Sequence, residues 1–341
     1  MQRINIEQAQ KLWQEESLFT LGKMAHEIRL RLHPENIVTY IVDRNINYTN
    51  ICVSACKFCA FFKPPGHEEG YVLNFGELER KISETLELGG AQILLQGGMN
   101  PDLDLVFYQN MLEFIKDRFP QVAVHGFSPP EIFFLAGESK LSVEEVISML
   151  VKSGLDSIPG GGAEILADRV RMDLSPRKCM SWQWLEVMKK AHLLGLKTTA
   201  TMMFGHVETL TERIVHLEKI RSLQDETKGF TAFIPWTFQP GNTQIKAKEA
   251  SSDEYLKFLA LSRIFLDNIP NIQASWVTQG SKVGQLALLW GANDFGSTMI
   301  EENVVAAAGV CFKMPENTLR ELIQGAGFVP RKRRMDYGLV E

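Results

Sequence analysis

The sequence alternates between short apolar runs and amphipathic stretches about eight times, and this alternation most constrains the fold. The apolar runs, which we interpret as strands, cover residues 37–48, 91–95, 122–125, 155–158, 197–203, 230–235, 272–277 and 293–296. The stretches interpreted as helices cover residues 76–89, 103–118, 142–152, 182–194, 208–224, 253–267 and 281–290. Apolar runs of this kind are typical of parallel strands buried on both faces. The pattern therefore predicts an α/β fold, a (β/α)8 TIM-type barrel, with a doubly wound sheet as the alternative.

Two further segments flank the alternating region. Residues 6–32 carry apolar side chains at three-to-four spacing and end before Pro34, which predicts one long helix. We therefore expect an N-terminal helical extension over residues 1–36 and a barrel over residues 37–314. Residues 315–341 are expected to form a short C-terminal tail that packs on or near the barrel.

Composition excludes several classes of partner. The net charge is −5 and the pI is about 5.9, which disfavours nucleic acid and anionic membranes. The one basic run, Arg331 to Arg334, is typical of a solvated tail. We find neither an apolar signal core nor a stretch of the roughly 18 apolar residues that span a membrane. The sequence therefore predicts a protein that binds neither nucleic acid nor membrane. Its five cysteines, three of them clustered, do not resemble a disulfide framework, and reduced cysteines indicate the cytoplasm.

Three cysteines follow the first expected strand, in the run Cys52-Val53-Ser54-Ala55-Cys56-Lys57-Phe58-Cys59. This close spacing lets three thiolates reach one metal cluster, and the next cysteine is distant, at Cys179. A four-iron cluster held by three cysteines keeps one iron free to bind a small molecule. Because a structural zinc usually needs four protein ligands, we favour a [4Fe-4S] cluster on Cys52, Cys56 and Cys59.

Unusual segments also follow other expected strands. They are Gln96-Gly97-Gly98, His125 to Glu131, Pro159 to Glu164, Gly205 to Glu208 and Trp236 to Asn242. Active sites of barrels form at the carboxyl ends of the strands, where glycines permit close approach of a ligand. His125 and His206 at these ends are either acid–base groups or hydrogen-bonded parts of the fold. Glu131 and Glu164 are either proton acceptors or first residues of the helices that follow.

The cysteine motif, with Phe58 before its last cysteine, resembles that of the radical S-adenosylmethionine (SAM) superfamily. The segments similar to its menaquinone and deazaflavin branch are Asn47 to Asn50, Ser128-Pro129-Pro130-Glu131 and Gly154 to Glu164. The segments that resemble the futalosine-pathway members are Gly205 to Thr209 and Leu223 to Thr227, and Phe233 to Pro240 resembles the dehypoxanthine futalosine cyclases. The resemblance covers about residues 38–310 and departs at Lys228, where glycine is expected.

The resemblance implies roles for particular residues. The residues expected to bind the cofactor are Phe58, Gln96, Gly97, Gly98, Gly205 and Glu208. The candidates for the catalytic base are His206 and Glu164. The residues expected to bind the substrate are His125, Trp236 and Phe238. The two aromatic residues suit a site that excludes water, although burial in a core explains them equally well.

The resemblance also implies a reaction of a radical SAM oxidoreductase and cyclase. A reduced [4Fe-4S] cluster cleaves SAM, and a 5′-deoxyadenosyl radical abstracts the C4′ hydrogen from the ribose of dehypoxanthine futalosine. The carbon radical adds to the benzoate ring, and loss of an electron and a proton gives cyclic dehypoxanthinyl futalosine, in menaquinone (vitamin K2) biosynthesis. The implied electron donor is a low-potential protein such as flavodoxin or ferredoxin.

Three alternatives stay open. Aminofutalosine synthase and a deazaflavin-type synthase are other activities within the superfamily. A non-catalytic, zinc-binding barrel is the alternative of another class, because a fold by itself does not establish a function.

Overall fold

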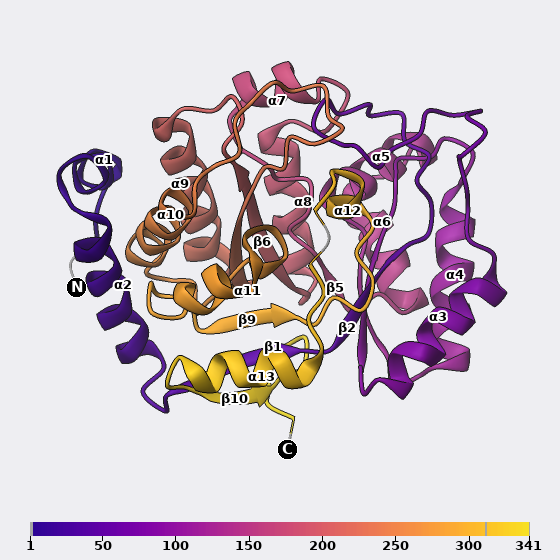
Figure 1. Cartoon of the computed structure of the whole chain (residues 1–341). Coiled ribbons are helices and arrows are strands. Elements are labelled where there is room, and N and C mark those ends of the chain that lie inside the picture. Colours follow the sequence, from indigo (N-terminus) through magenta and orange to yellow (C-terminus); the bar gives the residue numbers. More distant parts are fainter. Residues whose placement is uncertain (1–2, 311, 341) are drawn as a thin grey trace.

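The core of the structure is one curled sheet of parallel strands with helices around its outer side (Figure 1). The computed structural model describes residues 3–310 and 312–340. The strands lie in chain order: β2 (Asp43–Asn47), β3 (Gln92–Gln96), β4 (Ala123–Gly126), β5 (Ser157–Ile158), β6 (Lys197–Phe204), β7 (Phe230–Thr237) and β8 (Asn271–Ile272). Each strand pairs in parallel with its neighbour, so all carboxyl ends lie at one end of the sheet. The predicted α/β fold of the TIM-barrel type is confirmed.

A second, three-stranded sheet lies between the two edges of the curled sheet. Its central strand, β1 (Ile37–Ile41), pairs in parallel with β9 (Asp294–Ser297) and β10 (Val329–Lys332). Gln273, just after β8, forms a bridge to Asp294 in β9, and β1 leads through Val42 into β2. The prediction of one strand over residues 37–48 was wrong, because this segment forms two strands, β1 and β2, that belong to different sheets.

Most helices follow the strands in the predicted order. They are α3 (Phe75–Glu87), α4 (Leu105–Arg118), α6 (Val143–Ser153), α8 (Ser181–Leu193), α9 (Leu210–Thr227), α10 (Ser252–Phe265) and α11 (Trp276–Ala287). Their starts carry strong local signals: at α3, for example, Asn74 and Glu77 cap each other's backbone N–H groups. The predicted strand over residues 272–277 was too long, because α11 already begins at Trp276.

Three helices near the site were not predicted, α5 (Pro129–Ser139), α7 (Asp168–Leu174) and the short α12 (Val304–Ala307). The sequence of α5 begins Pro-Pro and is apolar around most of its circumference, so it lacks an amphipathic period. The helix α7 has 7 residues, too few for the period to show.

The two ends of the chain pack on the barrel. The predicted single helix over residues 6–32 is two helices, α1 (Ile6–Glu15) and α2 (Leu18–Leu32), because the Ser17 side chain caps a new start. Near the other end lie the short α12 (Val304–Ala307) and α13 (Glu316–Gly325), followed by β10 in the small sheet. The interpretation of Arg331 to Arg334 as a solvated tail was wrong, because the run begins in β10 and Arg333 is buried in an ion pair with Asp294. The proposed domain limits remain predictions. In the part of the chain that the structure describes, no helix combines the length and the apolar character needed to cross a membrane.

Candidate functional site

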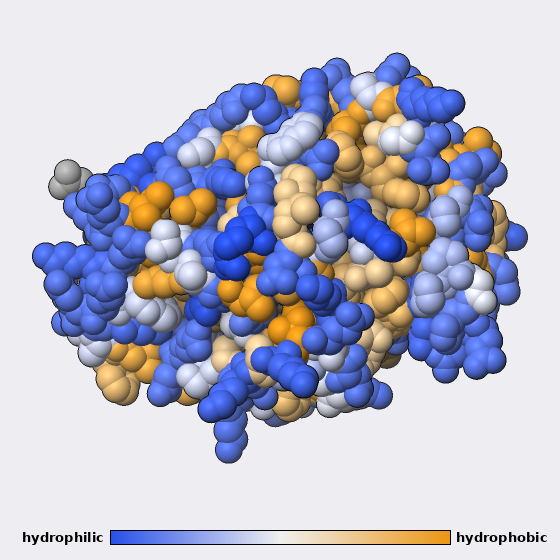
Figure 2. Space-filling model, turned by 90° about the horizontal axis from the view of Figure 1, so that it is seen from above, coloured by the Kyte–Doolittle hydropathy of each residue, from blue (hydrophilic) through white to orange (hydrophobic). Residues whose placement is uncertain are grey.

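The cysteine loop follows β2 and forms one wall of a cavity of about 250 Å³, which we name the outer chamber. The other walls come from residues 96–99 after β3, residues 161–164 after β5, and Trp236 and Phe238 of β7 and the segment after it. All these segments lie at the carboxyl ends of strands. Seen from the side on which the cysteine loop lies, the surface is hydrophilic at its rim and apolar residues gather near the centre (Figure 2).

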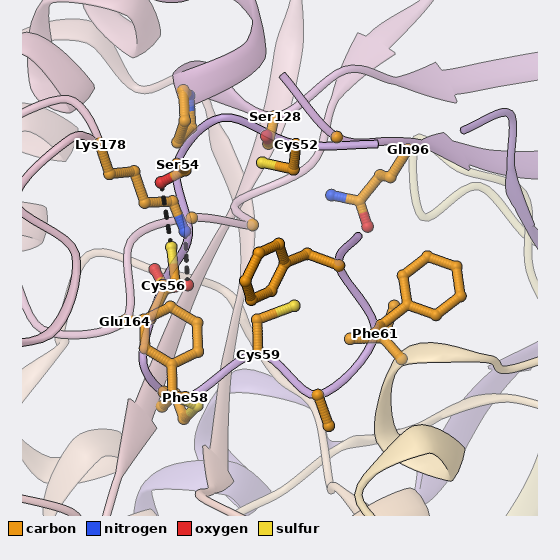
Figure 3. A pocket seen from close by; sticks show the side chains of 18 of the residues that line it. Cys52, Ser54, Cys56, Phe58, Cys59, Phe61, Gln96, Ser128, Glu164 and Lys178 are labelled. Carbon is orange, nitrogen blue, oxygen red and sulfur yellow. Dashed lines mark hydrogen bonds and ion pairs between the residues drawn. The ribbon is translucent and has the colours of Figure 1, made fainter. Parts of the chain in front are cut away.

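The three predicted metal ligands share this chamber. Cys52, Cys56 and Cys59 all line it, and their sulfur atoms approach one space from different sides (Figure 3). The Met99 N–H donates to the Cys52 sulfur at 3.4 Å, and the Ser54 hydroxyl lies 3.1 Å from the Cys56 sulfur. Burial raises the pKa of the Cys56 thiol to about 11, so a thiolate there needs a neighbouring positive charge such as a metal. Three thiol ligands in one chamber fit a four-iron cluster with one open iron.

The predicted glycine segment lies directly against the cysteine loop. A Cβ atom on Gly97 would lie 2.4 Å from the Tyr48 ring, and one on Gly98 would lie 2.1 Å from the Ile51 carbonyl oxygen. A side chain at either position would overlap these atoms, so only glycine allows the glycine segment to contact the chain before and within the cysteine loop. Gln96, Gly97 and Gly98 all line the outer chamber, beside the cysteines.

Glu131 joins three parts of the site. It is the third residue of α5, and one carboxylate oxygen accepts hydrogen bonds from the Ser128 N–H at 2.7 Å and the Ser128 hydroxyl at 2.5 Å. The other oxygen accepts from the Gly97 N–H at 2.9 Å and the Tyr48 hydroxyl at 2.5 Å. Glu131 is 3% exposed and lines the outer chamber. Its carboxylate therefore ties the glycine segment to the start of the cysteine loop.

A buried ion pair lies beside Cys56. Lys178 donates to Glu164 Oε1 at 2.7 Å, and its ammonium group lies 5.2 Å from the centre of the Phe58 ring (Figure 3). Glu164 Oε2 has no partner among the described residues, and the backbone of Glu164 has a φ of 39°, a region that non-glycine residues rarely adopt. Lys178 was missed because it stands in the chain between α7 and α8, far from every predicted strand end.

A second cavity of about 280 Å³, the inner chamber, lies inside the curled sheet. Alternate residues of neighbouring strands line it, among them Asp43, Asn45, Gln92, His125, Thr199 and Thr201. Gln96, Gly161 and Trp236 line both chambers, so the chambers adjoin. Barrel interiors are usually filled by branched apolar side chains, so a hollow interior lined in part by polar groups indicates space for a ligand. Of these residues only His125 was predicted from the sequence, because residues 43–47 contain one apolar residue, Ile46, and show no alternation of apolar and polar residues.

The structure separates the remaining predicted residues. His125 lines the inner chamber, Phe58 and Phe238 line the outer chamber, and Trp236 lines both. Gly205, His206 and Glu208 line neither chamber. Both ring nitrogens of His206 have partners: Nδ1 accepts from the Val207 N–H at 2.8 Å and lies 2.8 Å from the Glu208 carboxylate, and Nε2 lies 3.0 Å from the Met203 carbonyl oxygen. The segment with Gly205, His206 and Glu208 thus lies outside the two chambers, and the roles expected for it stay predictions.

Models of two protein families match most of the chain. A model of the radical SAM superfamily matches residues 46–220, and a model described as the CofH/MqnC C-terminal region matches residues 227–341. Among solved structures, methylornithine synthase (PylB) has a TM-score of 0.72 at 15% identity, covering 96% of this chain and 94% of its own. At this identity, the likeness shows the fold alone.

Curated relatives cover nearly the whole chain. Cyclic dehypoxanthine futalosine synthase of Halalkalibacterium halodurans is 49% identical, over 99% of this chain and 92% of that protein. The protein of the same name from Streptomyces coelicolor is 45% identical, over 98% of this chain and 85% of its own. A 5-amino-6-(D-ribitylamino)uracil--L-tyrosine 4-hydroxyphenyl transferase of Archaeoglobus fulgidus is 43% identical, over 94% of this chain and 93% of that protein. With its three-cysteine loop at the mouth of a parallel barrel, the chain thus belongs to the radical SAM superfamily of enzymes, in the group with the CofH/MqnC C-terminal region.

Proposed function

We propose that the protein is a radical SAM cyclase that converts dehypoxanthine futalosine to cyclic dehypoxanthinyl futalosine in menaquinone biosynthesis. The observation that carries the proposal is the pair of adjoining chambers. One has the cysteines and the glycine segment, and the other is lined in part by polar groups and is large enough for part of a substrate. The two relatives named cyclic dehypoxanthine futalosine synthase, at 49% and 45% identity, support this substrate. The three cysteines would hold the [4Fe-4S] cluster, which together with SAM supplies the radical that abstracts the ribose C4′ hydrogen.

The chain's own residues prepare the chambers for that chemistry. Glu131 fixes the backbone of Gly97, which we propose faces the methionine part of SAM together with Gln96 and Gly98. Phe58 and Phe238 line the outer chamber, where their rings exclude water from a reactive radical. Trp236 stands where the chambers adjoin, and we propose that it packs against the substrate.

Glu164 is our proposed acceptor for the proton lost in the last step. Its Oε2 atom has no partner among the described residues, and Glu164 lines the outer chamber. His206 was the other candidate, and its ring nitrogens are both engaged outside the chambers. We therefore place the base at Glu164, with Lys178 holding the other carboxylate oxygen.

The test is an anaerobic assay of the reconstituted protein with SAM, dithionite and dehypoxanthine futalosine, with products identified by mass. We expect cyclic dehypoxanthinyl futalosine and 5′-deoxyadenosine in about equal amounts. Glu164→Gln is expected to lower cyclised product by roughly 100-fold, in the usual range for a lost general base, while SAM cleavage continues. If Glu164→Gln and wild type form equal amounts of cyclised product, Glu164 is not the proton acceptor. His206→Gln is the comparison variant.

Glu131→Gln is expected to weaken SAM binding. The amide NH2 group would replace one carboxylate oxygen and would face two of the four donors that now bond the carboxylate, so Glu131 could no longer hold both the Gly97 segment and Ser128. We expect the Kd for SAM to rise roughly 10- to 100-fold, the usual cost of one or two hydrogen bonds to a charged group. Equilibrium binding of SAM to the iron-loaded protein measures this.

Glu145→Gln is the matched control for that variant. Glu145 accepts hydrogen bonds from the N–H and hydroxyl groups of Ser142 at the start of α6, as Glu131 does from Ser128 in α5. It lies on the surface, away from both chambers. An equal loss of SAM affinity in both variants would mean that Glu131 acts only as a helix cap.

A second candidate function comes from the relatives named 5-amino-6-(D-ribitylamino)uracil--L-tyrosine 4-hydroxyphenyl transferase, at 43% identity for Archaeoglobus fulgidus. Supplying 5-amino-6-(D-ribitylamino)uracil and L-tyrosine in place of dehypoxanthine futalosine tests this candidate in the same assay.

For either function, we propose a low-potential electron donor such as flavodoxin or ferredoxin, because Lys57, next to Cys56, is exposed and the cluster would lie near the surface.

A further inference from the structure

His125 presents a hydrogen-bond acceptor to the inner chamber. The Ser157 hydroxyl donates to the Lys197 carbonyl at 2.5 Å, so it must accept from His125 Nδ1, 2.8 Å away. The ring proton is therefore on Nδ1, and Nε2 has a lone pair, 3.5 Å from the Thr199 hydroxyl. Burial, and then the charge of Arg333, lowers the pKa of His125 to about 3, which keeps the ring neutral.

Two amide side chains that line the inner chamber have oxygen atoms without a hydrogen-bond partner among the described residues. Gln92 Nε2 donates to Asp43 Oδ2 at 2.8 Å, which fixes the orientation of the amide. Gln92 Oε1 and Asn45 Oδ1 then have no hydrogen-bond partner in the described part of the chain. The two residues are 5% and 4% exposed and both line the chamber. Buried acceptors without partners are rare in folded proteins, so the two amide oxygens indicate a ligand that brings hydrogen-bond donors. Nε2 of His125, whose contact with the Thr199 hydroxyl is long, can accept a further hydrogen bond from the same ligand.

The charges around the inner chamber disfavour an anionic group. Among the described residues that line it, Arg333 is the one cation, and its guanidinium group is paired with Asp294 at 2.5 and 3.1 Å. Two carboxyl groups, of Asp43 and Glu302, also line the chamber. A carboxylate placed here would meet like charges and find no free cation, whereas a hydroxyl group would be accepted.

We propose that the inner chamber binds the ribose hydroxyl groups of the substrate and keeps the substrate's carboxylate out. This proposal rests on the proposed function, because dehypoxanthine futalosine carries both a ribose and a benzoate. Gln96, Gly161 and Trp236 line both chambers, and the proposal places the ribose at this boundary with its C4′ side toward the outer chamber. Its hydroxyl groups then face His125, Gln92 and Asn45, and the benzoate stays on the outer side.

Two variants test the proposal by removing acceptors with little loss of internal bonding. Asn45→Ala deletes an oxygen that has no partner. His125→Asn removes the Nε2 acceptor while its amide N–H still reaches toward Ser157. His192→Asn is the matched control: His192 is also buried between two hydroxyl groups, those of Thr227 at 2.6 Å and Thr198 at 2.7 Å, and lines neither chamber.

The measurement is equilibrium binding of three ligands to the iron- and SAM-loaded protein. They are dehypoxanthine futalosine, its analogue lacking one ribose hydroxyl, and its analogue with a carboxamide in place of the carboxylate. Wild type and His192→Asn are expected to bind the deoxy analogue roughly tenfold more weakly than the substrate. In Asn45→Ala and His125→Asn this preference should fall to about twofold or less, with the carboxylate preference and the Kd for SAM unchanged.

Three results would overturn the proposal. A changed carboxylate preference with an intact hydroxyl preference would place the benzoate in the inner chamber. Weaker SAM binding, with both substrate preferences intact, would mean that the acceptors serve the ribose of SAM. Loss of the hydroxyl preference in His192→Asn as well would show a general effect of destabilisation. If the wild-type protein binds the substrate with these preferences but makes no cyclised product, the proposed function alone is refuted. If one of the two variants does not fold, the other variant decides the test.

Discussion

Replacing Cys56 by alanine is expected to abolish both the iron–sulfur absorbance of the reconstituted protein and its cleavage of SAM. Cys56 supplies one of the three sulfur atoms in the outer chamber, and two cysteines do not hold a four-iron cluster firmly. Without the cluster no electron reaches SAM, so the loss should be complete rather than partial. Iron content, visible absorbance and 5′-deoxyadenosine measure the three consequences separately.

Cys179→Ala is the control for this experiment. Cys179 is also buried, at 6% exposure, and its carbonyl oxygen accepts hydrogen bonds from Arg171, but it does not line the outer chamber. We expect full iron content and normal SAM cleavage from this variant. Formation of 5′-deoxyadenosine by Cys56→Ala would contradict the assignment of the ligand.

Replacing Asp294 by alanine is expected to destabilise the fold by about 3–5 kcal/mol, because it leaves a buried guanidinium group without its counter-ion. Asp294 is fully buried in β9 and accepts two hydrogen bonds from Arg333, one from the Thr39 hydroxyl at 2.5 Å, and one from the Gly296 N–H at 2.9 Å. Thermal unfolding and urea unfolding measure the change.

The double variant Asp294→Leu with Arg333→Met separates charge from packing. Replacing both partners of a buried ion pair by apolar groups is often close to neutral, so the double variant should be more stable than Asp294→Ala. If both proteins lose the same stability, the hydrogen bonds to Thr39 and Gly296 matter more than the buried charge of Arg333.

Features of the site that depend on neighbouring residues could be predicted from the sequence. The three cysteines lie within one short loop, so their spacing alone indicated a shared ligand, and the structure places them in one chamber. The strand–helix alternation predicted the barrel for a similar reason, because each unit carries its own apolar period and capping residues.

Features that depend on distant contacts could not be predicted. Glu131 and Gly97 are 34 residues apart, and Lys178 is 14 residues beyond Glu164, with an unpredicted helix, α7, between them. The sequence around Glu131 indicates only its local role, the cap that it forms with Ser128 at the start of α5. The division between β1 and β2 was hidden because it depends on β10, a strand near the other end of the sequence.

The pairing of β1 with β10 has a consequence for synthesis of the protein. On the ribosome, β1 emerges early, but its partner at residues 329–332 and the Arg333 counter-ion of Asp294 emerge almost 300 residues later. Until then, the small sheet that separates the polar interior from water on one side is incomplete. We expect a nascent chain that stops before residue 329 to be far more sensitive to protease than the full chain, since non-local pairings form only after both partners exist.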